Sequence, residues 1–365
     1  MNAKNSQIIA CPSCEKKISF KNSDLIDLKA SLLCSACEKP LLYYFDRPFT
    51  DMAPEAFTHK LDSQMLEALK KIPGIDTVLR TVLRHSFELS MRLHHQGNFI
   101  QVSKKQLKSL HKQLEEAARI LDIHELPELY VVQDSRANAY TFGVEKCAIA
   151  ISSGCLDLMS KSEISCVLAH ELGHIKARHV LYKTAARVFS SLADSLAQKT
   201  LGLGGVVLMP IKIALLRWDR ASELSSDRAA LLVVKNPTVL LTTLMKLAGG
   251  SESLNRELNI QAFIDQAQNY EKTQDEGPLG SYLALMNSMF NSHPFPIWRA
   301  QEIIEWLNSG DYFAILQGRY KLAKKLEDTN NQSPTSDFGI SDRVDKTIKD
   351  LRSWWDKNLN LPEER

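Results

Sequence analysis

The chain has little of what marks an exported or membrane-spanning protein. Its first seven residues lack the apolar core of a signal peptide, and we therefore expect a cytoplasmic protein. The longest apolar run, Leu201 to Leu216, spans 16 residues and contains Pro210 and Lys212. A membrane-spanning helix needs about 20 predominantly apolar residues. We interpret the run as a buried or interfacial helical hairpin, which would allow a peripheral membrane contact through 201–216.

The sequence also lacks an excess of charge of either sign. Its 45 basic and 43 acidic residues leave a formal net charge of +2, so no nucleic-acid partner is expected. Hydrophobic residues make up 44% of the 365 residues, which is enough for a sizeable core. The length suits one large domain or two to three smaller ones.

Cysteine is present, in a pattern that does not favour disulfides. Seven cysteines in a chain without a secretion signal indicate metal ligands or buried thiols. Cys11 and Cys14 form one C-x-x-C pair, Cys34 and Cys37 form a second, and 19 residues separate them. Each pair can direct two thiolates at one tetrahedral ion, so we predict a structural zinc ribbon over residues 8–45. The alternatives are free thiols, or a redox dithiol, which needs one pair rather than two.

A second candidate metal site lies in the order H-E-x-x-H at His170, Glu171 and His174. Ser160 and Glu163 resemble a capping box that begins a helix. In a helix, residues i and i+4 differ by about 40° and rise by about 6 Å, so both imidazoles can reach one metal. Glu171 borders the same face and can act as a base beside a metal-activated water. The alternative is two surface histidines, but the apolar flanks indicate a buried helix.

Two acidic residues downstream can complete this site. Glu223 and Asp227 share a helix face, because they are four residues apart. Glu223 can serve as the third ligand of a His₂Glu zinc site, and Asp227 can orient a ligand imidazole. The alternative is a pair of solvated surface acids, but apolar residues on both sides make a fully exposed helix improbable.

Two further segments have weaker local signals. His293 is held between helical segments by prolines and could stabilise an oxyanion, although it could also be an ordinary loop histidine. Two strands are expected at 128–133 and 147–152. Between them, Asn138 and Ala139 could contact a peptide along a sheet edge. The local sequence alone favours an ordinary turn there.

The chain resembles the HtpX-like and CAAX prenyl protease type I group of zinc metallopeptidases, which are gluzincins. The matching pieces cover roughly residues 60 to 310 and occur in the family's order. They are Asn138-Ala139-Tyr140, the H-E-x-x-H segment, Glu223 with Asp227, Ser292-His293-Pro294, and Arg299.

The resemblance implies a role for each piece and a fold. It makes Glu223 the third zinc ligand, Asp227 its support, and His293 and Arg299 groups that hold the transition state. Asn138 and Ala139 would bind the substrate backbone along an edge strand. The implied fold is α+β, mainly α, with a small sheet beside the H-E-x-x-H helix and the zinc ribbon in front.

The sequence departs from two related patterns. Transmembrane members of the group have long hydrophobic spans, so this chain looks like the soluble branch. A metzincin would have glycine at Ala177 and histidine at Val180, and His179 is one residue out of place. We interpret His179 as a bystander.

We therefore predict a zinc-dependent endopeptidase that binds one catalytic and one structural zinc ion and acts on polypeptides. The metallopeptidase domain is expected over 60–325, after a linker over 46–60. A polar linker over 326–341 and an amphipathic helix over 342–360 would follow. The alternative function is a zinc-stabilised protein-interaction module with a non-catalytic metal site.

Overall fold

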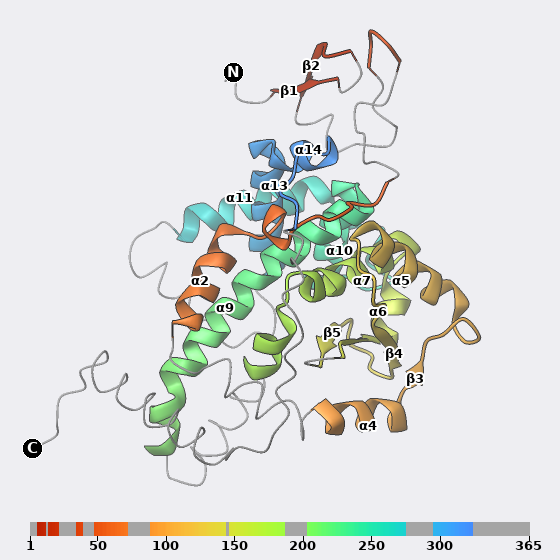
Figure 1. Cartoon of the computed structure of the whole chain (residues 1–365), viewed down its shortest axis with the longest axis vertical. Coiled ribbons are helices and arrows are strands. Elements are labelled where there is room, and N and C mark those ends of the chain that lie inside the picture. Colours follow the sequence, from red (N-terminus) through yellow and green to blue (C-terminus); the bar gives the residue numbers. More distant parts are fainter. Residues whose placement is uncertain are drawn as a thin grey trace, which may run out of the picture.

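The computed structural model describes residues 6–11, 14–21, 34–38, 47–71, 88–143, 146–186, 203–274 and 295–323. The predicted linker over 326–341 and helix over 342–360 lie outside these ranges, as does His293. Most of the described chain is helical, and a small sheet lies on one side of α7 (Figure 1). The expected α+β, mainly helical fold is confirmed.

The helices supply most of the framework. They are α2 (Lys60–Lys70), α4 (Glu88–Asn98), α5 (Lys108–Ile120), α6 (Ser153–Leu158), α7 (Lys161–Lys176), α9 (Leu203–Val234), α10 (Pro237–Gly249), α11 (Ile260–Gln274), α13 (Pro296–Ser309) and α14 (Asp311–Leu316), with a 3-10 turn η1 at Pro54–Ala56. The long α9 crosses the molecule diagonally, with α2 packed along it (Figure 1). Helix α7 lies at the centre, packed against α9, α5, α10 and the sheet.

The sheet has four strands in the order β3-β4-β6-β5. Strands β4 (Glu128–Val132) and β6 (Ala148–Ser152) pair in parallel, while β5 (Ala139–Phe142) pairs antiparallel to β6. The short β3 (Ile100–Gln101) pairs antiparallel to β4. Both predicted strands are therefore present. The segment that the local sequence favoured as a turn is instead β5, which lies at an edge of the sheet and packs on α7.

Two other local expectations differ from the structure. From Leu203 onward the apolar run forms one continuous helix, α9, rather than a hairpin. Gly204 and Gly205 fall in its first turn, where the amide groups have no carbonyl partner within the helix, so glycine does not break it. Within the described ranges, none of the helices combines the length and apolarity that a bilayer crossing requires.

The segment expected to be a linker contributes to the hydrophobic core. Phe49, Met52 and Phe57 have no solvent exposure and belong to the same core cluster as residues of α5, α7 and α9. Backbone contacts also tie this segment to residues near the end of the described chain, since Ala53 N–H donates to the Lys321 carbonyl at 2.9 Å. The hydrophobic residues, rather than Pro48 and Pro54, decide how this segment packs.

The amino-terminal unit is a separate hairpin. Strands β1 (Ser6–Ala10) and β2 (Lys17–Lys21) pair antiparallel, and they lie beyond α14 at the top of the view (Figure 1). The turn between them contains Cys14, and Cys11 follows directly after β1. The hairpin therefore supplies the first pair of the predicted zinc ribbon.

Candidate metal centre and active site

Helix α7 begins with a complete capping box. The Ser160 backbone N–H donates to Glu163 Oε2 at 2.7 Å, and the Glu163 N–H donates to the Ser160 hydroxyl at 3.4 Å. Lys246 of α10 also donates to Glu163 Oε2 at 2.7 Å. These contacts fix where α7 starts, and so which residues it presents to α9 two to three turns later.

The structure brings His170, His174 and Glu223 together at the contact between α7 and α9. One ligand atom from each lies within 4.8 Å of the others, and all three side chains are buried. Glu223 Oε2 is 3.3 Å from His170 Nε2, and its Oε1 is 3.2 Å from His174 Nε2. The three predicted ligands therefore converge from two helices.

The donor set fits zinc. Two imidazole nitrogens and one carboxylate are a ligand combination of catalytic zinc sites. His174 Nε2 is buried, and among the described residues it has no hydrogen-bond partner of acceptable geometry. A buried polar atom without a partner is costly, and a metal ion at this position would satisfy it.

Asp227 and Arg299 lie behind His170. Asp227 Oδ1 is 2.9 Å from His170 Nδ1, and Arg299 donates two hydrogen bonds to the Asp227 carboxylate at 2.6 and 2.7 Å. Burial lowers the pKa of His170, but its contacts with Asp227 and Glu223 outweigh burial and raise the pKa to about 9. Burial and the nearby Lys183 charge instead hold the pKa of His174 well below its usual value.

Glu171 is held from the sheet side. It is 3% exposed and accepts a hydrogen bond at Oε2 from the Thr141 hydroxyl at 2.5 Å. Thr141 is on the edge strand β5, two residues after Ala139, so the two side chains share a face of the strand. Sequence reasoning missed Thr141. The local signal that could have found it is its position, two residues after Ala139.

Lys183 is a second residue that sequence reasoning missed. Its ammonium group donates to Glu223 Oε1 at 2.6 Å and to Asp219 Oδ1 at 2.7 Å, and the side chain is 4% exposed. A buried lysine beside the Glu223 carboxylate balances part of its negative charge. Nothing in the spacing of the motif pointed to Lys183.

A cleft of about 410 Å³ opens beside this cluster, with His170 and Glu171 in its wall. Asn138 and Ala139 line it together with Glu171 and Arg299. Most of the rest of its wall is apolar, and these residues are Ala137, Cys155, Cys166, Val167, Leu240, Leu244, Leu247, Ala248, Phe295 and Pro296. The wall of the cleft therefore combines polar side chains of the cluster with an apolar surface that α10 largely supplies.

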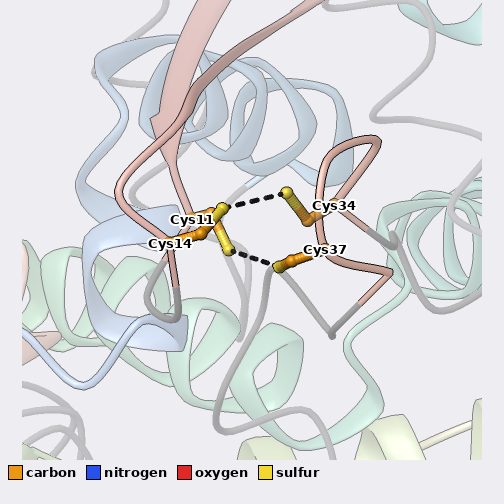
Figure 2. Close-up of side chains that lie close together, drawn as sticks. All are labelled: Cys11, Cys14, Cys34 and Cys37. Atoms are coloured by element: carbon orange, nitrogen blue, oxygen red, sulfur yellow. Dashed lines mark hydrogen bonds between the residues drawn. The ribbon is translucent and has the colours of Figure 1, made fainter.

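The four predicted ribbon cysteines also converge (Figure 2). Cys11 Sγ lies 3.6 Å from Cys37 Sγ, and Cys14 Sγ lies 3.5 Å from Cys34 Sγ. Sulfur atoms that bind one tetrahedral zinc ion at about 2.3 Å lie about 3.8 Å apart, whereas a disulfide needs about 2.05 Å. The cluster therefore has the spacing of a Cys₄ zinc site.

The two cysteine knuckles have matching backbones. The Glu15 N–H donates to the Cys11 carbonyl at 2.9 Å, and the Glu38 N–H donates to the Cys34 carbonyl at 2.8 Å. Both glutamates are in the left-handed region, with φ of 59° and 56°. Each cysteine pair is thus closed by an equivalent backbone hydrogen bond. The Ala36 N–H contributes to lowering the pKa of Cys34 to about 6, which favours its thiolate.

Comparison with known proteins assigns the family. The model of peptidase family M48 matches residues 104–307, which include His170, His174 and Glu223. A plastoglobule-localized metallopeptidase 48 of Arabidopsis thaliana chloroplasts is 39% identical over 271 residues, which cover 74% of this chain and 77% of that protein.

More distant relatives carry the HtpX name. A protease HtpX homolog 2 of Methanosarcina acetivorans is 27% identical over 190 residues, 45% of this chain and 64% of the relative. A protease HtpX homolog of Burkholderia thailandensis is 24% identical over 215 residues, 51% of this chain and 70% of the relative. No solved structure matches the chain. The chain therefore belongs to peptidase family M48 and is a zinc metalloprotease of the HtpX-like group.

Proposed function

We propose that the chain is an endopeptidase in which His170, His174 and Glu223 hold the catalytic zinc ion and Glu171 is the general base. The convergence of these three ligand atoms within 4.8 Å, with Glu171 on the same helix, is the observation that carries the proposal. When bound, zinc would polarise the scissile carbonyl and make a water molecule more acidic.

Glu171 moves the proton. It takes a proton from the attacking water at one carboxylate oxygen and delivers it to the nitrogen of the leaving amine. The Thr141 hydroxyl holds Oε2 of Glu171 and so orients the carboxylate. Asp227, held by Arg299, keeps Nε2 of His170 directed at the metal by binding its Nδ1. The predicted transition-state roles of Arg299 and His293 stay predictions.

The substrate lies in an extended conformation along β5. This strand is at the edge of the sheet, and Asn138 and Ala139 at its start line the cleft. A peptide backbone can pair with such an edge, as an added strand does. The aliphatic wall of Val167, Leu240 and Leu244 favours a large apolar side chain next to the scissile bond.

The Glu171→Gln variant tests the mechanism. We expect it to keep its zinc and to lose about 10²- to 10⁴-fold in the rate of casein hydrolysis, because the amide cannot accept the proton. The matched control is Glu116→Gln, since the Glu116 side chain is 54% exposed on α5. Undiminished hydrolysis by Glu171→Gln would exclude the general-base role.

Three predictions about the wider protein remain proposals. Two zinc ions per chain follow if both clusters are filled, which metal analysis would measure. The peripheral membrane contact through 201–216 would appear as co-flotation with lipid vesicles. The cytoplasmic location would be tested by fractionation of cells that contain the full chain.

A further inference from the structure

A buried polar cluster lies behind His174 and is centred on Asp62 of α2. Asp62 has no solvent exposure. Its Oδ1 accepts a hydrogen bond from Trp218 Nε1 at 2.9 Å, and its Oδ2 accepts one from the Ser225 hydroxyl at 2.6 Å. His179 Nε2 lies 2.9 Å from the same Oδ2. Both oxygens of Asp62 therefore act as acceptors.

His179 connects this cluster to His174. Its ring is 1% exposed, and its Nδ1 lies 3.1 Å from Nδ1 of His174. The chain turns sharply after α7, because Arg178 has a φ of 60° and the His179 N–H donates to the His174 carbonyl at 2.9 Å. This turn folds the His179 ring back against the ligand imidazole. The backbone turn therefore holds His179 close to His174, a proposed zinc ligand.

The contacts determine which nitrogens carry protons. Asp62 accepts, so Nε2 of His179 donates and its Nδ1 is left as an acceptor. Two ring nitrogens 3.1 Å apart can share only one proton, so Nδ1 of His174 must then donate to His179. In a neutral imidazole this leaves Nε2 of His174 as the atom with a lone pair, and Nε2 is the atom nearest to Glu223.

We propose that Asp62 and His179 are positioning residues that hold His174 in the tautomer and orientation needed to bind zinc. The inference rests on the proposed function, in which His174 is a zinc ligand. Each of the two imidazoles would then be oriented by a carboxylate. Asp227 contacts His170 directly, whereas Asp62 acts on His174 through His179. Asp62 lies before residue 104, where the family match begins.

Ser226 is the competing explanation. Its hydroxyl oxygen lies 2.9 Å from the same Nδ1 of His174. A hydroxyl can donate or accept, so it fits either tautomer and cannot select one. The Asp62 carboxylate can only accept, so it fixes the tautomer of His179. The tautomer of His179 in turn fixes that of His174.

Two substitutions at one position separate the roles. In His179→Asn, the amide oxygen can take the place of Nδ1 and accept from His174, while the contact with Asp62 is lost. In His179→Gln, the longer amide can reach Asp62 in place of Nε2. His174 then loses the acceptor that His179 supplies and keeps the Ser226 hydroxyl, which fits either tautomer. We expect His179→Gln to bind zinc about 10- to 100-fold more weakly than the wild type, and His179→Asn to lie between them.

Asp62→Asn tests the carboxylate. An amide that donates to Nε2 of His179 would reverse its tautomer, so that two N–H groups face each other between His179 and His174. We expect weaker zinc binding and an altered absorption spectrum of the cobalt-substituted protein, although the side chain keeps its shape. Zinc affinity is measured on the full chain by competition with a chelator, and circular dichroism of each metal-free variant checks folding.

His174→Ala identifies the zinc ion that belongs to this site, and His124→Ala is the control, because the His124 side chain is 89% exposed. If His174→Ala leaves zinc binding unchanged, the proposed function itself is wrong. If His174→Ala removes one zinc ion but His179→Gln binds as tightly as the wild type, only the positioning role is wrong. A larger loss in Ser226→Ala than in His179→Gln would also overturn it.

Discussion

Gly173 stands between the two metal-facing histidines of the proposed site, where α7 meets α9. A Cβ atom at this position would lie 2.8 Å from the Ala229 Cβ and 3.1 Å from the Ser226 Cα. The second neighbour is backbone, so it cannot rotate away. The absence of a side chain thus allows the two helices to approach closely enough for Glu223 to meet the histidines.

We expect Gly173→Ala to lower the free energy of unfolding by about 1–3 kcal/mol and to weaken zinc binding, because the added methyl group pushes α7 and α9 apart. Chemical denaturation and chelator competition would measure the two effects. Gly97→Ala is the matched control, since nothing lies within 4 Å of a Cβ there and alanine favours the helix. Equal stability of the two variants would contradict this reading of Gly173.

Thr141 gives a second prediction at the scale of one residue. Thr141→Val keeps the shape but removes the hydroxyl that donates to Glu171. A hydrogen bond to a charged group contributes about 1.5–3 kcal/mol, so we expect kcat to fall about tenfold or more. Zinc affinity should hardly change, because the Thr141 hydroxyl donates to the proposed base, Glu171, which is not a proposed ligand. A loss of zinc together with activity would show that Thr141 has another role.

At the scale of the element, the start of α7 depends on an ion pair as well as on its cap. Burial raises the pKa of Glu163, but the Lys246 ammonium and the Ser160 contacts outweigh it and hold the pKa below its usual value of 4.5. A carboxyl with a lowered folded-state pKa stabilises the fold above its unfolded pKa. That contribution is lost as the pH falls through the folded-state pKa.

Glu163→Gln should therefore unfold more easily than the wild type at pH 7, by about 1–3 kcal/mol. The difference should shrink as the pH falls below about 4.5 and the wild-type carboxyl is protonated. Denaturant titrations between pH 7 and pH 3 would measure it. A gap between the two proteins that stays constant across this range would argue against a role for the charge.

Helix α10 supplies much of the apolar wall of the cleft, so we expect this element to set the side-chain preference of the proposed protease. Leu247→Ala should lower kcat/KM for peptides with a large apolar residue beside the scissile bond, by about tenfold or more. A peptide-library digest would measure the shift toward other residues. Leu254→Ala is the control, because Leu254 is 51% exposed and does not line the cleft. An unchanged preference in Leu247→Ala would place the pocket elsewhere.

For the whole molecule, the four ribbon cysteines and the proposed ligands His170, His174 and Glu223 are separate clusters. A unit as small as the ribbon has little core, so metal binding would supply much of its folding free energy. Cys34→Ser with Cys37→Ser should lower the zinc content from two ions to one and expose the ribbon to proteolysis, while peptide hydrolysis continues. Loss of hydrolysis in this variant would mean that the ribbon supports the catalytic part.

The sequence was informative where function depends on short spacings. His170 and His174 lie one turn apart, and each cysteine pair forms one knuckle, so local geometry alone predicted that each set converges. Thr141, Lys183 and Asp62 were not predictable in this way. Each contacts its partner through tertiary packing across 30 or more residues. His179 is close to His174 in sequence, but its contact with His174 depends on the backbone turn at Arg178.

The fold class could be predicted because helix signals are local in the sequence. The edge strand and the packing of the segment at 47–57 could not be predicted in this way. The start of α7 could be predicted, because its capping box of Ser160 and Glu163 is a local sequence pattern. The edge strand β5 was hidden by a turn-like composition, since its pairing with β6 is a property of the sheet. The segment at 47–57 was misread because two prolines suggested a linker, whereas Phe49, Met52 and Phe57 are core residues.

The contacts of Asp62 have a practical consequence for anyone who shortens this gene. A fragment that starts at residue 104, where the family match begins, lacks Asp62. Trp218 Nε1 and the Ser225 hydroxyl would then lose their acceptor in the protein interior. Such a fragment should aggregate on expression. A minimal protease has to begin ahead of Phe49.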